Sequence, residues 1–239
     1  MTITLITGAD KGIGFETARE LGQQGQHILV GARDRTRGQA AVDRLRADGC
    51  TADLVLLDVT KDDTITAAAE QISRDYGALT ILINNAGVAF DRHQPASTMP
   101  VSTMRQDFDV NFFGLVAVTQ AMIPLLKKGT PARIINVSSN MGSLTLASDP
   151  TSRYYGVSSL GYQASKAAAN FATVCFSKEL AAAGITVNAI NPGYTDTEFG
   201  GSRGGEQTVA EGAAQIVKAA TAANFGTGTF TETAGKLPW

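Results

Sequence analysis

Tyr162 and Lys166 stand four residues apart in the segment YQASK. This segment opens a predicted alanine-rich helix, in which residues i and i+4 lie on one face. An ammonium beside a phenol favours the phenolate and lowers the pKa of the phenol. A phenol with a lowered pKa is suited to general acid catalysis near neutral pH. The spacing therefore predicts an acid–base pair, although a helix that merely buries Tyr162 and exposes Lys166 shows the same pattern.

Ser138 and Ser139 follow a predicted strand at Arg133–Val137. In doubly wound sheets, ligands bind in the crevice outside the carboxyl ends of the strands. A hydroxyl at this place can hydrogen-bond a substrate carbonyl and stabilise the developing alkoxide. Taken alone, such a serine pair more often marks only a strand-to-loop transition.

The segment TGADKGIG joins the first predicted strand to the first predicted helix and contains Gly8, Gly12 and Gly14. Glycines allow a tight turn and a close approach of the backbone to a pyrophosphate, which the helix N-terminus attracts. The spacing is G-x-x-x-G-x-G, which is weak by itself because the chain contains 25 glycines. Its position between a strand and an amphipathic helix nevertheless predicts a dinucleotide site.

Arg33 follows the second predicted strand, 19 residues after Gly14. In an NAD-binding fold this position carries an acid that binds the ribose hydroxyl. A guanidinium suits a 2′-phosphate instead, because it can form two parallel hydrogen bonds to it. Lys11 adds a positive charge, whereas Asp10 and Asp34 weaken the local positive field. We predict NADP(H) rather than NAD(H), with two solvated surface cations as the alternative.

Strands and helices alternate along the whole chain, and they must position these residues. Short β-branched runs of continuous apolar character predict the buried strands of a parallel sheet. The predicted strands are Ile3–Thr7, His27–Ala32, Leu54–Leu57, Leu79–Ile83, Arg133–Val137, Thr186–Ile190 and a last short one near Gly228–Thr231. The predicted helices are 13–24, 35–48, 61–75, 101–127, 162–183 and 207–221. The pattern predicts an α/β fold: one Rossmann-type, doubly wound parallel sheet of about seven strands, flanked by helices on both faces, in a single domain over 1–239.

Composition and charge exclude several classes of partner. The 239 residues are 44% apolar and 18% charged, with a formal net charge of -2. These values are ordinary for a globular protein and give no electrostatic reason to expect nucleic acid or an anionic membrane as a partner. Cys50 and Cys175 lack metal or redox spacing, so we expect no metal and a reduced, cytoplasmic protein. The opening MTITLITG enters a strand at once, and we expect neither a signal peptide nor a transmembrane helix.

Taken together, the motifs resemble those of the short-chain dehydrogenase/reductase family over nearly the whole chain. They are the glycine loop at 7–14, LDVT with Asp58, NNAG at 84–87, Asn111 in VNFFG, NVSS at 136–139, Tyr162 with Lys166, and NPGYTDT at 191–197. The individual motifs are weak, but seven in one order at sensible spacing are specific. KGIG with Arg33 resembles the NADP-preferring branch, and the chain is similar to carbonyl-reductase-like members.

The resemblance implies four catalytic residues, Asn111, Ser139, Tyr162 and Lys166. Tyr162 would protonate the carbonyl oxygen as hydride arrives from the nicotinamide, and Lys166 would bind the nicotinamide ribose. Asn111 would lie at a helix irregularity and hold a water of the proton relay. Substrate contacts would come from Ser139, Tyr162, Met141 and Tyr194. The implied cofactor-binding residues are Gly8, Lys11, Gly12, Ile13, Gly14, Arg33, Asp58 (on the adenine), Val59, Asn85, Ala86, Gly87, Tyr162, Lys166, Pro192, Gly193, Thr195 and Thr197 (the last four on the carboxamide).

One departure concerns the 23-residue separation of Ser139 and Tyr162, which is longer than in the commonest members. We predict an insertion near the active site at 140–161 and a substrate-binding loop at 194–208. The candidate pocket residues Phe90, Met141, Leu144, Tyr194 and Phe199 favour an apolar or aromatic carbonyl compound, and Tyr155 is a further candidate on the insertion. The family usually forms dimers or tetramers through helices that correspond to 101–127 and 162–183, while the insertion also permits a monomer.

The prediction for function is an NADPH-dependent oxidoreductase that reduces a ketone or aldehyde to an alcohol by hydride transfer. Two alternatives stay open. An NAD-linked alcohol dehydrogenase working oxidatively has Arg33 against it. A regulator that senses NADP without chemistry typically loses the tyrosine or the lysine of the pair, and this chain keeps both.

Overall fold

The computed structural model describes residues 1–91, 93–199 and 204–239. Its described strands form one sheet in the order β3-β2-β1-β4-β5-β6-β7-β8. All neighbours pair in parallel except β7 and β8. The strands are β1 Ile3–Thr7, β2 His27–Ala32, β3 Thr51–Leu56, β4 Ile81–Asn84, β5 Ala132–Val137, β6 Ile185–Ile190, β7 Phe230–Glu232 and β8 Gly235–Lys236.

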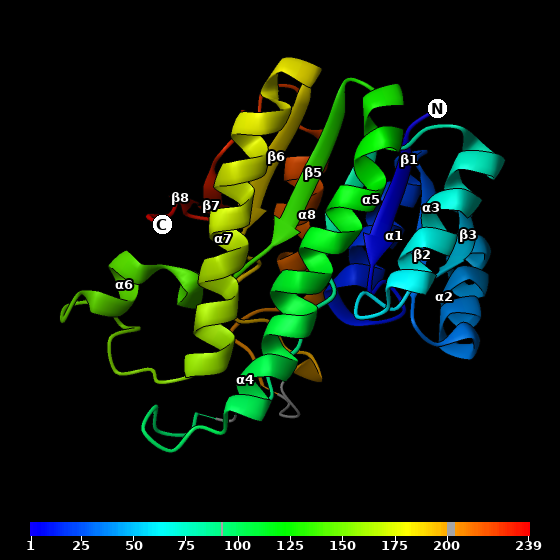
Figure 1. Cartoon of the computed structure of the whole chain (residues 1–239). Helices are drawn as coiled ribbons and strands as arrows, with labels where there is room; N and C mark the ends of the chain where they lie inside the picture. Colours follow the sequence, from blue (N-terminus) through cyan, green and yellow to red (C-terminus); the bar gives the residue numbers. More distant parts are fainter. Residues whose placement is uncertain (92, 200–203) are drawn as a thin grey trace.

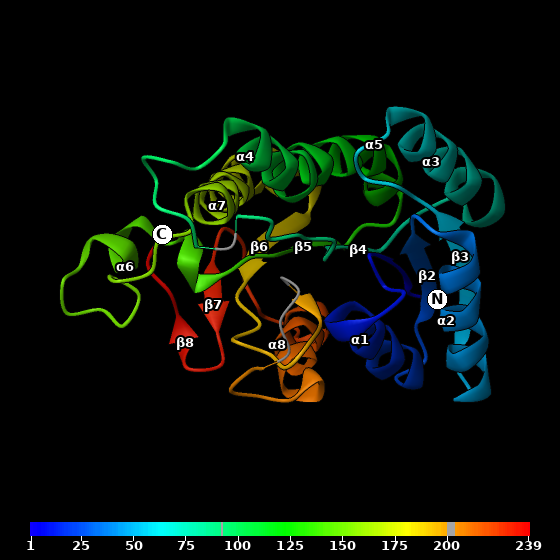
Figure 2. The ribbon, with the colours of Figure 1, turned by 90° about the horizontal axis from the view of Figure 1, so that it is seen from below.

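Helices cover both faces of the sheet. One layer contains α1, α2 and α8, and the other contains α3, α4, α5 and α7 (Figure 2). The helices are α1 Gly12–Gln23, α2 Arg35–Ala47, α3 Asp62–Tyr76, α4 Val101–Phe108, α5 Leu115–Lys128, α6 Leu144–Ser148, α7 Leu160–Leu180 and α8 Val209–Thr221, with the short segments η1 Asp109–Gly114, η2 Asn140–Gly142 and η3 Ala181–Ala183.

The core lies in two layers because alternate residues of each parallel strand point to opposite faces. Leu5 and Leu82 pack into the layer beneath α3, α5 and α7, whereas Ile6 and Ile83 pack into the layer beneath α1, α2 and α8. All four side chains are fully buried. Each continuous apolar run of the sequence thus provides core side chains to both faces of the sheet.

The run Val101–Lys128 is one continuous helical rod of α4, η1 and α5, with a π-helical segment at its centre. By length and composition alone this rod is apolar enough to cross a membrane. However, Val118, Met122 and Leu126 are fully buried against the sheet. In this structure the rod is therefore a core helix that packs on the sheet of the α/β fold.

The predicted fold class is confirmed, with small differences at its edges. The described sheet has eight strands rather than about seven, because a two-residue antiparallel strand, β8, follows β7. The segment 140–161 contains η2 and α6, and it projects beyond α7 (Figure 1). The C-terminal residue is joined to this segment, since the Trp239 carbonyl accepts hydrogen bonds from the Thr145 amide (3.2 Å) and hydroxyl (2.8 Å).

Candidate active site

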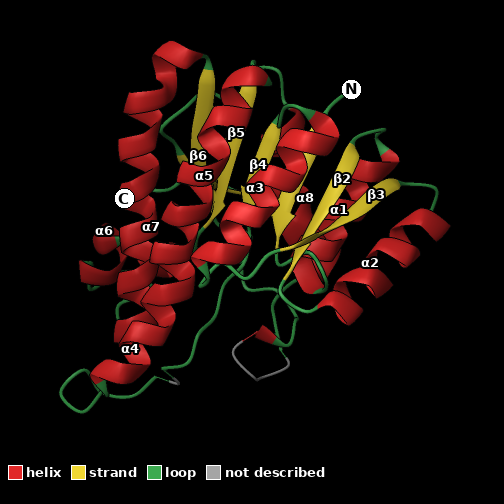
Figure 3. Cartoon of the chain, turned by 45° about the vertical axis from the view of Figure 1, so that its right-hand side comes forward, coloured by secondary structure: helices red, strands yellow, loops and turns green. Residues whose placement is uncertain are grey.

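The carboxyl ends of the parallel strands point to one edge of the sheet, and the loops that carry the predicted site residues gather there (Figure 3). The glycine loop follows β1, Arg33 follows β2 and Asp58 follows β3. The NNAG segment overlaps the end of β4, Ser139 follows β5 and Pro192 follows β6. This is the edge at which α/β folds of this kind bind ligands.

The glycine loop turns sharply between β1 and α1. Gly8 and Gly12 have positive φ angles of 66° and 58°, which favour glycine. A Cβ at Gly14 would lie 2.4 Å from Asn85 Nδ2 and 2.6 Å from the Gly8 carbonyl. Gly8 and Gly12 therefore serve the backbone conformation and Gly14 the close packing, and Ile13 is partly buried.

The NNAG segment fixes the glycine loop from the neighbouring strand. Asn85 Nδ2 donates to the carbonyls of Thr7 (2.9 Å) and Gly8 (3.1 Å). The Thr7 hydroxyl in turn accepts from the amides of Asn85 and Ala86, both at 3.0 Å. Gly87 lies deeper in the site, where an added Cβ would be 3.4 Å from Asn111 Oδ1 and 3.6 Å from Lys166 Nζ.

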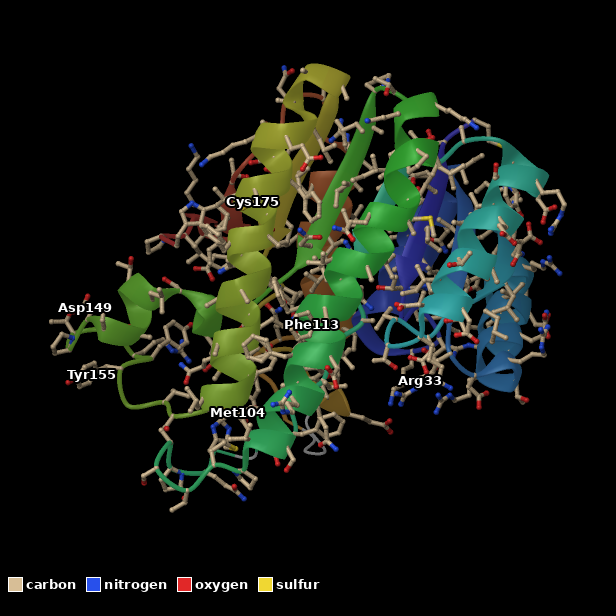
Figure 4. All side chains as sticks on the ribbon, viewed as in Figure 1. Arg33, Met104, Phe113, Asp149, Tyr155 and Cys175 are labelled. Atoms are coloured by element: carbon tan, nitrogen blue, oxygen red, sulfur yellow. The ribbon has the colours of Figure 1, made fainter. Side chains whose placement is uncertain are left out.

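Arg33 is exposed directly after β2 (Figure 4). The two acids expected to oppose it are both engaged by Arg37, which the sequence analysis did not single out. Asp10 pairs with Arg37 Nε at 3.2 Å, and Asp34 caps α2 by accepting from the Arg37 amide at 2.9 Å. Lys11 pairs with Glu198 across the surface at 3.3 Å, with both side chains more than 60% exposed.

The two serines after β5 face different ways. Ser138 Oγ donates to Asn170 on α7 at 2.6 Å and so holds the strand against that helix. Ser139 caps η2 by accepting from the Met141 amide at 3.2 Å, and its hydroxyl is near enough to Tyr162 to lower the pKa of the phenol. The structure therefore brings Ser139, and not Ser138, to the tyrosine.

Tyr162 and Lys166 lie on one face of α7, with Lys166 Nζ 5.8 Å from the centroid of the Tyr162 ring. Lys166 is only 5% exposed, and its ammonium donates to the Val137 carbonyl at 2.8 Å. The spacing prediction of a shared face is thus confirmed. Both side chains are held where β5 ends.

The prediction that the pKa of Tyr162 is lowered was wrong when the protein's own groups are considered. The pKa of Tyr162 is raised to about 12, chiefly by burial and also by the carboxylates of Asp107 and Asp91, while the Ser139 hydrogen bond opposes this rise. Burial lowers the pKa of Lys166 to about 8. Desolvation disfavours the charged form of each group and is the largest cause of both shifts.

Asn111 lies in the π-helical segment η1, so the predicted helix irregularity is confirmed. Its Nδ2 donates to the Val88 carbonyl (2.8 Å) and to Ser165 Oγ (2.9 Å), and its Oδ1 accepts from the Val88 amide (2.9 Å). Both amide protons are therefore used within the protein. A water held by Asn111 would therefore have to donate a hydrogen bond to the side-chain oxygen or to the backbone carbonyl of Asn111.

Asp58 and Val59 follow β3 at the same edge. Asp58 Oδ1 accepts from the Thr60 amide (3.1 Å) and hydroxyl (2.8 Å), which fixes the turn into α3. Val59 packs against η1, since a Cβ added at Gly114 would lie 2.8 Å from its side chain. The adenine contact implied for Asp58 stays a prediction.

The loop after β6 has one inward and one outward threonine. The Thr195 hydroxyl donates to the Gly193 carbonyl (3.2 Å) and accepts from Gln207 (2.9 Å). The side chain of Thr195, which was predicted to contact the carboxamide, therefore bonds within its own loop. Thr197 instead borders the glycine loop, 3.9 Å from the position of a Cβ at Gly12. Pro192 is buried, and its carbonyl accepts from Gln207.

One aromatic ring contacts Tyr162, and two further aromatic side chains of the predicted pocket are exposed. The Phe199 ring meets the Tyr162 ring edge-on at 5.8 Å, and Phe90 and Tyr194 are 48% and 62% exposed. Met141 is half-buried beside Ser139. Residues 200–203 of the predicted substrate-binding loop lie outside the described residues.

The insertion is joined to both the serine and the loop after β6. Asn140 Nδ2 donates to the Tyr154 hydroxyl at 2.5 Å, and Arg153 pairs with Glu206 at 2.6 Å. Leu144 is 72% exposed. Tyr155 lies at the outer edge of the insertion, with Asp149 and away from Arg33 (Figure 4). The predicted pocket role thus suits Met141 better than Tyr155.

The residues present fit a dinucleotide phosphate. Among the described residues, the first turn of α1 has neither an acidic side chain nor a side-chain cap at Lys11. Its backbone N–H groups are thus free to bind an anion at the positive end of the helix dipole. Within the described ranges, no three His, Cys, Asp or Glu side chains gather to hold a metal ion. Fold and site together define a dinucleotide-dependent oxidoreductase of the Rossmann type.

Comparisons with known proteins agree with this class. The family model "short chain dehydrogenase" matches residues 2–208. The short-chain dehydrogenase anuI of Penicillium roqueforti is 37% identical over 229 residues, covering 92% of this chain and 88% of its own. Carbonyl reductase [NADPH] 1 of Mus musculus is 37% identical over 140 residues, covering 57% and 48%. An NADPH-bound carbonyl reductase from chicken fatty liver superposes with a TM-score of 0.86 at 28% identity, covering 100% of both chains. The chain belongs to the short-chain dehydrogenase/reductase family and is an oxidoreductase.

Proposed function

We propose that this protein reduces the carbonyl of an apolar or aromatic ketone or aldehyde to an alcohol, with NADPH as the reductant. The observation that carries the proposal is the convergence of Tyr162, Ser139 and Lys166 where β5 and α7 meet. The carbonyl reductases among its relatives support the reaction class. Arg33 supports the 2′-phosphate, because the Arg37 guanidinium pairs with Asp10, and Asp34 is turned to the Arg37 backbone amide as the cap of α2.

In this proposal each residue has one task. The Ser139 hydroxyl donates a hydrogen bond to the carbonyl oxygen and so polarises it. When bound, NADPH supplies the hydride that reduces the carbonyl carbon. Tyr162 gives its hydroxyl proton to the same oxygen, which completes the alcohol and leaves a phenolate. Its high pKa, about 12, keeps the phenol protonated beforehand. The Lys166 ammonium stabilises the phenolate and, with a pKa of about 8, exchanges protons readily near neutral pH.

The rim of Phe90, Tyr194 and Phe199 supports the substrate class, since exposed aromatic rings bind flat apolar surfaces. A panel of aliphatic, aromatic and charged aldehydes, ketones, diketones and quinones tests this point. Preference for highly charged substrates would contradict it.

The decisive experiment follows NADPH consumption by absorbance with that panel, for the wild type and Tyr162→Phe. We expect turnover in the wild type and a loss of at least about 10²–10⁴-fold in the variant, because the general acid is removed. NADPH affinity, measured by fluorescence titration, should stay within a few-fold. Tight NADPH binding without turnover on any carbonyl would favour the sensing role instead. Turnover by Tyr162→Phe at the wild-type rate would contradict the mechanism.

A further inference from the structure

Two buried carboxylates flank the first turn of the helix that carries Tyr162. Asp91, in the loop after β4, is 2% exposed, and Asp107, on α4, is fully buried. Neither residue has a part in the mechanism above. Buried acids are rare unless their charge is compensated, so the pair requires an explanation.

Asp91 caps α7 from outside the helix. Its Oδ1 accepts from the Ser159 hydroxyl, and its Oδ2 accepts from the backbone amide of Tyr162 at 3.1 Å. Ser159 is the N-cap residue of α7, but among the described residues its side chain makes no cap bond of its own. The carboxylate of Asp91 replaces it and lies at the N-terminus of α7, at the positive end of the helix dipole.

Asp107 has the opposite surroundings. Its Oδ1 accepts from the Phe90 amide at 2.9 Å, next to Asp91 in the chain. Its Oδ2 is buried without a partner among the described residues, and a Cβ at Gly161 would lie 2.7 Å from it. An ionised carboxylate with one oxygen unpaired in the interior is unfavourable, and a second carboxylate nearby makes it more so.

We propose that Asp91 and Asp107 are positioning residues for the proposed reduction, with Asp91 holding a negative charge and Asp107 a proton beside the first turn of α7. The pair fixes the Tyr162 backbone through Asp91 and fixes the loop that carries Asp91 through Asp107. The expected effect of the two acids on turnover rests on the proposed function. The location of the charge on Asp91 and of the proton on Asp107 does not.

The electrostatic environment agrees with this assignment. Burial, and then Asp91, raise the pKa of Asp107, and the negative charge of Asp91 raises the pKa of Tyr162. The titratable groups that face Tyr162, among the described residues, are Asp107 from α4, Asp91 from the loop after β4 and Lys166 from α7 itself. Ser139 and Phe199 face it from the other elements and carry no charge. The negative charge thus keeps the phenol protonated, as reduction requires.

The first test measures the titration of Tyr162 without turnover, from the ultraviolet phenolate absorbance of each protein after subtraction of its Tyr162→Phe counterpart. Asp91→Asn should lower the midpoint by about 0.5–1 pH unit, because a negative charge is removed. Asp109→Asn is the matched control, since this acid is exposed on the same rod, and it should change nothing. An unchanged midpoint in Asp91→Asn would overturn the proposal.

The second test locates the proton without depending on a fragile variant. The infrared spectrum of the wild type at pH 7 should contain a protonated-carboxyl band that disappears in Asp107→Asn and persists in Asp109→Asn. Absence of the band from the wild type would overturn the assignment of the proton to Asp107.

Activity supplies the third readout. The alkaline limb of kcat/KM for reduction should move to lower pH in Asp91→Asn, in the same direction as the phenol titration. An equal loss of kcat/KM at every pH, with an unmoved limb, would reduce Asp91 to a purely structural role. A wild type without carbonyl reductase activity would refute the proposed function, while the titration and infrared results would still decide the carboxylate pair.

Discussion

At the scale of single residues, burial decides the charge states of the candidate site more strongly than sequence spacing does. Four residues of separation place Tyr162 and Lys166 on one face, and this was predictable from helix geometry. The burial of that face was not predictable from the sequence. Because both groups lose water, the pKa of the phenol rises and that of the ammonium falls. The sequence therefore predicts the partners correctly and the direction of the Tyr162 shift incorrectly.

Burial of Lys166 should make the folded state less stable at neutral pH than it would be without this charge. The folded-state pKa is about 8 and the ordinary value is 10.5, so between them the unfolded chain binds more protons and stability rises with pH. Below about pH 8 the full cost, roughly 3 kcal/mol, is present. Lys166→Met removes it but leaves the Val137 carbonyl unpaired, at about 1 kcal/mol. The net gain of about 2 kcal/mol should raise Tm at pH 7 by about 4–8 °C.

This gain should shrink as the pH approaches the ordinary lysine pKa, because the wild type then loses its buried charge. Differential scanning calorimetry between pH 6 and 10 measures it. Lys178→Met, at an exposed position of the same helix, is the matched control and should change little at any pH. A lower Tm for Lys166→Met at pH 7 would show that the ammonium stabilises the fold.

Arg33 should determine the preference for NADPH. Loss of a charge-assisted hydrogen-bonding group from a phosphate costs about 1.5–3 kcal/mol, so Arg33→Ala should weaken NADPH binding by about 10–100-fold. NADH binding should hardly change, because that cofactor lacks the 2′-phosphate. Fluorescence titration with both cofactors measures this. Arg35→Ala, two residues along and also exposed, is the control, and equal NADPH affinities for Arg33→Ala and the wild type would refute the role.

At the scale of elements, the strands were more predictable than the connections between them. The predicted strands at Ile3–Thr7, His27–Ala32 and Thr186–Ile190 match within a residue, because β-branched runs buried on both faces are distinctive. The π-helical segment carries no periodic signal, and its place came only from the family resemblance. Asp91 and Asp107 were missed because isolated acids look solvated in a sequence, and only the fold shows them buried beside α7.

The turn from β1 into α1 should tolerate no side chain at Gly14. A Cβ there would lie 2.4 Å from Asn85 Nδ2 and 2.6 Å from the Gly8 carbonyl, so Asn85 would have to leave the carbonyls that it holds. We expect Gly14→Ala to lower the free energy of unfolding by about 1–3 kcal/mol and to weaken NADPH binding. Urea denaturation and fluorescence titration measure the two effects.

Gly156→Ala is the control for that substitution. Nothing lies within 4 Å of the position of its Cβ, so its stability should stay within about 0.5 kcal/mol of the wild type. If Gly14→Ala behaved in the same way, the close packing of the glycine loop on Asn85 would have no energetic consequence.

At the scale of the whole molecule, the helical layer of α4, α5 and α7 presents exposed apolar side chains. Phe113 and Phe171 are 56% and 69% exposed, and Cys175, one turn after Phe171, is exposed on the same helix. Phe113 and Cys175 both lie on the side of this layer that faces the viewer in Figure 4. Large exposed apolar side chains gathered on one face are typical of protein interfaces. The insertion lies to one side of α7 and leaves this face uncovered (Figure 1).

We therefore expect a homo-oligomer that pairs through α5 and α7, as predicted from the family resemblance. Phe171→Glu places a charge on α7, where desolvating it on association is costly, so the variant should be a monomer. Light scattering during size-exclusion chromatography measures the mass of both proteins. Leu144→Glu, an equally exposed apolar position on the insertion, should keep the wild-type mass. A monomeric wild type would contradict the expectation, and the exposed phenylalanines would then need another partner.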